Sequence, residues 1–76
     1  MTEQEIFNAL SAENEEFKKL GREHRELDSI LAELNGRVYL TPEEEMEKKR
    51  LQKLKLQKKD RMAELIRKYK KSHSLN

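Results

Sequence analysis

The sequence predicts an all-α protein, an antiparallel and coiled-coil-like helical hairpin that is preceded by a short N-terminal helix. Apolar residues recur every three or four positions in two long stretches, and a single break with the only Pro separates these stretches. The chain has 76 residues, of which 42% are charged and 34% hydrophobic, and it contains no cysteine. This composition is close to that of disordered proteins, but the strong helical periodicity indicates a folded chain. We expect residues 1–76 to form one small domain.

The first element is a short helix over residues 2–11. Thr2 and Glu5 have the spacing of a capping box, in which each side chain bonds to the backbone of the other residue. Ser11 and Asn14 prefer helix caps to helix interiors. We therefore expect the chain to kink before the next helix begins.

The second element is a helix over residues 14–35. Its apolar positions are three, four or seven residues apart, which places them on one stripe of the helix together with one histidine. On this helix the predicted hairpin seam consists of Phe17, Leu20, His24, Leu27, Leu31 and Leu34.

A short loop over residues 36–41 follows. Gly36 suits the left-handed position just past a helix end, and Thr41 is suited to cap the next helix. Pro42 then takes the first helical position, and Glu44 completes a second capping box. Because the connection is short, the two long helices are expected to run antiparallel.

The last helix is predicted over residues 42–70, with a tail over 71–76. Its stripe also repeats every three or four residues, except where Lys58 interrupts it. On this helix the predicted seam consists of Leu51, Leu54, Met62, Leu65 and Tyr69. Pairing across the loop predicts that Leu27 lies near Leu51 and Phe17 near Met62.

Charge is divided unevenly between the two halves of the chain. Residues 1–35 carry nine acidic and four basic side chains, whereas residues 43–76 carry six acidic and twelve basic ones. The last helix is therefore basic, although the net charge is only +2. Its candidate contacts for phosphates or for an acidic partner are Lys48, Lys49, Arg50, Lys53, Lys55, Lys58, Lys59 and Arg61.

These residues resemble the YdcH-like family of short bacterial proteins. The first half carries the family's Phe-x-x-Leu-x-x-x-His-x-x-Leu-Asp pattern over residues 17–28, and the second half carries the family's Lys-rich stretch of Leu, Lys and Asp over residues 51–62. With Ala12-Glu13-Asn14 and Leu40-Thr41-Pro42, the resemblance covers most of residues 8–66. The sequence departs from the family at Leu54 and Lys58, where we expect a local rotation of the seam. The resemblance implies a helical hairpin and no known function.

His24 and Asp28 are four residues apart and therefore share one helical face. A zinc site needs three or four ligands, and the only other histidine lies near the end of the chain. We therefore expect no metal and no cofactor, and we interpret His24 as a seam residue near Leu54, Lys55 and Lys58. In this interpretation Asp28 pairs with Lys55 or Arg50, and the polar residues of the seam are His24, Asp28 and Lys55.

No motif for catalysis is present. The sequence has no glycine-rich phosphate loop, no nucleophile elbow and no cysteine, so we expect neither an enzyme nor a small-molecule substrate. The N-terminus lacks a hydrophobic signal region, and no stretch approaches the roughly 20 apolar residues that span a bilayer. We expect a cytoplasmic protein that does not bind membranes.

The favoured hypothesis is a non-catalytic structural or adaptor protein that binds through its apolar stripe. The alternative is an accessory, non-specific nucleic-acid-binding protein that uses the basic helix. The partner is either a second copy in a dimer or another helical protein, because the seam leaves five apolar side chains on flanking positions: Ile6, Phe7, Ile30, Leu56 and Ile66. As an open alternative to the dimer, Ile6, Phe7 and Leu10 fold back as a third helix within the chain.

Overall fold

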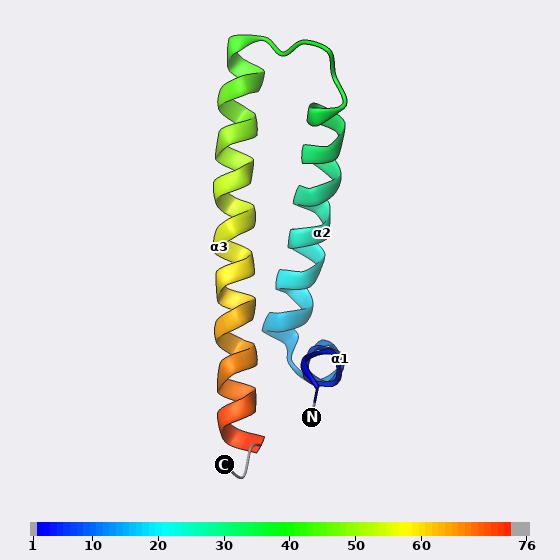
Figure 1. Ribbon diagram of the computed structural model, residues 1–76, viewed down its shortest axis with the longest axis vertical. Helices are drawn as coiled ribbons and strands as arrows, with labels where there is room; N and C mark the ends of the chain where they lie inside the picture. Colours follow the sequence, from blue (N-terminus) through cyan, green and yellow to red (C-terminus); the bar gives the residue numbers. More distant parts are fainter. Residues whose placement is uncertain (1, 74–76) are drawn as a thin grey trace.

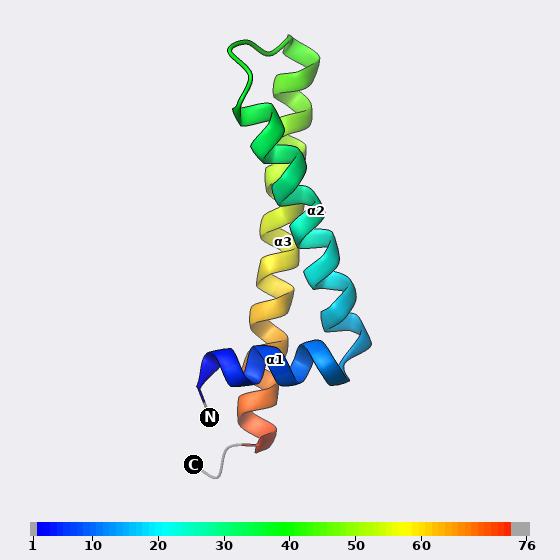
Figure 2. The same ribbon diagram turned by 90° about the vertical axis from the view of Figure 1, so that its right-hand side faces the viewer.

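The computed structural model describes residues 2–73 and is entirely helical, which confirms the predicted all-α class. Within this range it has no strand. Helix α1 spans Glu3–Glu13, α2 spans Glu15–Asn35 and α3 spans Pro42–His73. Helices α2 and α3 lie side by side and are joined by the loop at one end, and α1 lies across them at the other end (Figures 1 and 2). The molecule is elongated, with extents of 52 × 20 × 16 Å.

Both predicted capping boxes are present. The Glu5 N–H donates to Thr2 Oγ1 at 3.1 Å, and the Thr2 N–H donates to the Glu5 carboxylate at 2.9 Å. The same reciprocal pair joins Thr41 and Glu44, with distances of 3.0 and 3.2 Å. Each box satisfies backbone donors that a helix start leaves without a partner.

Asn14 alone forms the corner between α1 and α2. Its extended backbone, with φ −108° and ψ 113°, interrupts the helix for one residue. Its N–H donates to the Leu10 carbonyl at 2.9 Å, and its side-chain oxygen accepts from the Phe17 N–H at 2.9 Å. One residue therefore ends one helix and caps the next, which produces the abrupt change of direction seen in Figure 2.

The prediction for Gly36 is wrong. Gly36 has φ −78° and ψ −10°, in the right-handed region, and no described residue has a positive φ. Its N–H donates to the carbonyls of Ala32 and Glu33, so it continues the helical turn. Arg37 then contacts the carboxylates of both Glu33 and Glu44, and these ion pairs tie the loop to the helix on each side.

Helix α3 continues to His73, three residues beyond the end expected from the sequence. The His73 ring stacks on Tyr69 with 3.9 Å between ring centroids, and His73 Nδ1 lies 3.0 Å from the Tyr69 carbonyl oxygen. Lys70 and Lys71 also lie in this last turn, where positive charge favours the helix C-terminus. Of the predicted tail, residues 71–73 are helical and residues 74–76 lie outside the described residues.

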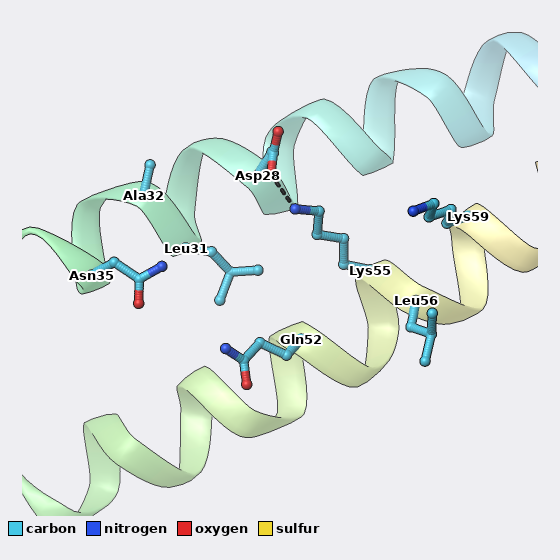
Figure 3. Close-up of a pocket in the computed structure, with 8 residues that line it drawn as sticks. All are labelled: Asp28, Leu31, Ala32, Asn35, Gln52, Lys55, Leu56 and Lys59. Atoms are coloured by element: carbon cyan, nitrogen blue, oxygen red, sulfur yellow. Dashed lines mark hydrogen bonds and ion pairs between the residues drawn. The ribbon is translucent and has the colours of Figure 1, made fainter.

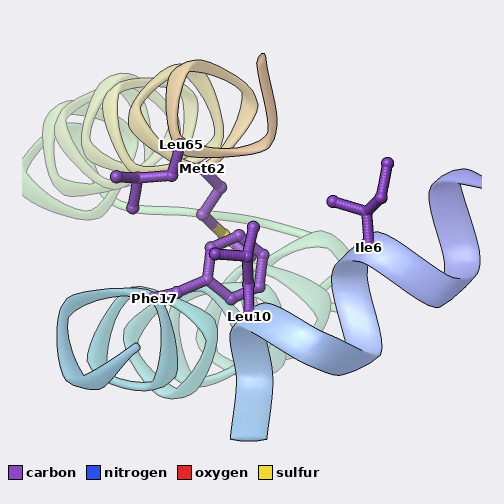
Figure 4. Close-up of a cluster of buried hydrophobic side chains, with 5 residues drawn as sticks. All are labelled: Ile6, Leu10, Phe17, Met62 and Leu65. Carbon is purple, nitrogen blue, oxygen red and sulfur yellow. The ribbon is translucent and has the colours of Figure 1, made fainter. Parts of the chain in front are cut away.

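The buried side chains form two clusters. The three-helix cluster joins α1, α2 and α3 at the end remote from the loop (Figure 4). Its members are Ile6, Leu10, Phe17, Met62 and Leu65. The hairpin cluster lies between α2 and α3 nearer the loop and consists of Leu27, Leu31, Leu34 and Leu51.

Candidate functional site

The predicted seam residues all lie on the inner side of the helices, either buried or half-buried. Leu27 shares the hairpin cluster with Leu51, and Phe17 shares the three-helix cluster with Met62. Four seam residues are half-buried, namely Leu20, His24, Leu54 and Tyr69. The seam is therefore occupied by internal packing between the helices, which leaves the outer surfaces for contacts with other molecules.

The N-terminal residues adopt the fold-back alternative. Ile6 and Leu10 are 2% and 5% exposed in the three-helix cluster, and the Phe7 ring meets the Phe17 ring edge-on with centroids 5.2 Å apart. Ile66 is half-buried against the same cluster. Of the five flanking side chains, Ile6, Phe7 and Ile66 are therefore covered or half-covered within the chain, whereas Ile30 and Leu56 stay exposed.

Three ion pairs connect α2 to α3. Arg61 holds Glu16 in a bidentate contact, with N–O distances of 2.8 and 3.0 Å. Lys58, the residue that interrupts the stripe, lies 3.3 Å from a Glu23 oxygen. Such surface pairs contribute little to stability individually, but oppositely charged pairs fix which residues lie opposite each other.

Asp28 and Lys55 form the third pair, as the sequence suggested (Figure 3). The hydrogen bond from Lys55 holds the pKa of the Asp28 carboxyl below its usual value. The hydrogen bond from Arg61 likewise lowers the pKa of Glu16. Both carboxylates therefore stay charged to lower pH in the folded chain than in the unfolded chain.

His24 lies on the same side of the hairpin as Lys55 and Lys59. Across residues 2–73, no group of three or more His, Cys, Asp or Glu side chains has an arrangement that would hold a metal ion. The other residues that line the hollow at His24 are basic, apolar or glycine, and the carboxylate of Asp28, four residues further along α2, is already paired with Lys55.

The eight candidate phosphate contacts divide into two groups. Four are engaged in ion pairs: Arg50 with Glu47, Lys55 with Asp28, Lys58 with Glu23, and Arg61 with Glu16 and Glu64. The other four have no ion-pair partner in the described part of the chain: Lys48, Lys49, Lys53 and Lys59. Pairing within the fold thus neutralises much of the basic helix.

Two open hollows lie on one side of the α2–α3 pair. The first has a volume of about 400 Å³ and lies around the Asp28–Lys55 pair, with Leu31 and Leu56 in its lining (Figure 3). The second has a volume of about 520 Å³ and lies nearer to α1, where Met62 and Ile66 contribute apolar surface. Lys55 lines both hollows.

Sequence reasoning missed several residues that shape this surface. Glu16 and Glu23 are seven residues apart and so lie along one edge of α2, a spacing that would have indicated a row of acids opposite the basic helix. Gly21 is buried at the second hollow and leaves it open, because it has no side chain. The sequence places Gly21 inside a predicted helix, four residues after Phe17, but it does not show that a hollow lies beside it.

Comparisons with known proteins give a family and no function. A family model described as "Protein of unknown function (DUF465)" matches residues 17–66, from the first turn of α2 to far along α3. No match was found among curated proteins or among solved structures. None of the helices in residues 2–73 is both long and apolar enough to cross a membrane. Because the matched region covers about two thirds of the chain and the YdcH-like proteins belong to the same family, the chain is a member of the DUF465 family of short helical proteins.

Proposed function

We propose that the chain is a non-catalytic interaction module, in which α2 and α3 act as an antiparallel, coiled-coil-like hairpin that docks a partner. One observation carries this proposal. The core is completed within the chain, yet large apolar side chains remain uncovered: Ile30 is 46% exposed, Leu56 56%, Met46 73% and Tyr39 83%. Leu56 also lines an open hollow between α2 and α3, and an uncovered apolar side chain at a hollow favours a binding surface.

Two features support a role without catalysis. The hollows are open and are lined by long surface side chains, whereas catalytic groups usually work in a site that excludes water. Asp28, the acidic residue in the lining of these two hollows, is engaged in an ion pair with Lys55 across the two helices. We propose that the protein acts in the cytoplasm, since its described helices are amphipathic and too polar to cross a membrane.

The partner is proposed to be a second copy or another helical protein. Self-association has less apolar surface to cover than the sequence suggested, because α1 packs on α2 and α3, which buries Ile6 and half-buries Phe7. Ile30 and Leu56 remain available for such a contact. Sedimentation equilibrium over a range of concentrations tests self-association, and a chain that stays monomeric at every concentration contradicts the dimer.

Non-specific nucleic-acid binding is the second candidate function. Lys49 and Lys53 are exposed, four residues apart on α3, and have no ion-pair partner in residues 2–73. Such a pair is suited to contact successive phosphates. With Lys55, Lys58 and Arg61 engaged by acids of α2, fewer cations are free for this role than the sequence suggests.

Affinity capture of the full chain from its native cells, at low and at high salt, separates the two functions. Phosphate contacts weaken steeply with salt, whereas apolar packing between helices changes little. We expect a protein partner that is retained at high salt. Recovery of nucleic acid alone, lost at high salt, supports the second candidate, and recovery of nothing at either salt contradicts both.

A further inference from the structure

The two hollows form one groove along the hairpin. Lys55 and Lys59 line both, so the hollows meet at these side chains. On α2 the lining runs from Gly21 to Asn35. At 1.5 Å per helical residue this is a length of about 21 Å, which matches about four turns of another helix.

The floor of the groove is apolar. Met62, Ile66 and Phe7 contribute to the second hollow, and Leu31 contributes to the first. Leu56 lines the first hollow and is 56% exposed, so a large part of its side chain is open to a partner. A helix that docks here would therefore need an apolar stripe of its own.

The rim of the groove is basic. Arg25 and Lys59 line the groove and have no ion-pair partner in the described range 2–73. The one acidic residue in the lining of the two hollows is Asp28, and Lys55 already pairs with its carboxylate. The groove thus offers free positive charge above an apolar floor.

From this combination we propose that the groove binds an acidic amphipathic helix of a partner protein. The proposal rests on the proposed function and names the surface and the chemistry of the partner. Charge complementarity selects an acidic partner over a second copy, because a symmetric dimer through this face would bring Arg25 and Lys59 of both chains together. Apolar contacts at Leu56 and Met62 would supply affinity, and the cations would set the orientation.

The test is an NMR titration of the ¹⁵N-labelled full chain with a designed helical peptide of 14 residues. The peptide carries Leu at helical spacing on one face and Glu on both flanks of that face. Two control peptides replace every Leu by Ser or every Glu by Lys. We expect the acidic Leu peptide to shift amides over residues 21–35 and 52–66, and both control peptides to bind at least tenfold more weakly.

Matched variants test the assignment of the surface. Lys59→Glu reverses a free cation on the groove rim, whereas Lys53→Glu reverses a free cation about 120° away around the same helix. We expect Lys59→Glu to weaken binding of the acidic peptide at least tenfold and Lys53→Glu to change it less than twofold. Circular dichroism of both variants checks that the fold is unchanged.

Each of the other outcomes contradicts the proposal that the groove binds an acidic helix. Each can also be told apart from a failure of the proposed interaction function. Equal losses in both variants would show binding by diffuse charge, and equal retention would place the peptide elsewhere while leaving an interaction module intact. Absence of any binding by the parent chain rules out the acidic partner, and affinity capture then judges the proposed function independently. Tighter binding of duplex DNA than of the peptide, lost equally in both variants, would favour the nucleic-acid function.

Discussion

Leu51→Ala should destabilise the protein strongly, whereas the same substitution at Leu56 should not. Leu51 is 6% exposed in the hairpin cluster, and Leu56, five residues later on α3, is 56% exposed. Truncating a buried Leu removes its transfer free energy and leaves a cavity, at a cost of about 2–5 kcal/mol. A chain of this length has a total stability of roughly 4–11 kcal/mol, so the loss at Leu51 is a large fraction of the whole.

Thermal and urea denaturation followed by circular dichroism at 222 nm measure this difference. A loss of about 3 kcal/mol corresponds to a fall in melting temperature of roughly 12–24 °C for a domain of this size. Leu56→Ala is the matched control, and its free energy of unfolding should stay within about 0.5–1 kcal/mol of that of the parent chain. If Leu51→Ala melts like the parent chain, or if Leu56→Ala is the more damaging change, the packing between α2 and α3 described above is wrong.

Three further predictions concern charge, metal and backbone. Because the folded-state pKa values of Glu16 and Asp28 are lowered, their stabilising contribution is present above the ordinary carboxyl pKa of about 4 and is lost as the pH falls below it. The urea midpoint should therefore fall with acid, and less so in the double variant Glu16→Gln, Asp28→Asn; equal falls would contradict the pairing. Equimolar zinc or nickel should leave the melting temperature unchanged, and a rise of several degrees would reveal a site at His24. Gly21→Ala should stabilise the chain by about 0.5–1 kcal/mol, since the added methyl group meets only Arg25 Nη1 at 3.7 Å; destabilisation would mean that the helix surface there is more crowded than described.

Local signals in the sequence predicted the helix starts well. The Thr2–Glu5 and Thr41–Glu44 boxes depend on residues three apart, so their geometry follows from the sequence once a helix forms. Gly36 shows the limit of such reasoning, because its lack of a side chain permits a left-handed conformation without requiring one. The hydrogen bonds from the Gly36 N–H to carbonyl groups of α2 accompany the right-handed form.

The position of α1 was harder to predict for a different reason. Ile6 and Leu10 form an apolar face, and that face packs equally well, as far as sequence alone can tell, against its own chain or a second copy. The choice depends on Met62 and Leu65, more than fifty residues away along the chain. The groove likewise depends on side chains from separate helices. The sequence therefore predicted that the last helix is basic, but it did not predict where the groove lies or how long it is.

The crosswise packing of α1 also has a consequence for the order in which the protein matures on the ribosome. Helix α1 is synthesised first, but the partners of Ile6 and Leu10 in the three-helix cluster include Met62 and Leu65, which are among the last described residues to be translated. The apolar face of α1 therefore cannot pack against α3 until nearly all of α3 has left the exit tunnel. Of the three helices, the one that is made first is thus the last to complete its packing, and the apolar side chains of Ile6, Phe7 and Leu10 lack part of their cover during this interval.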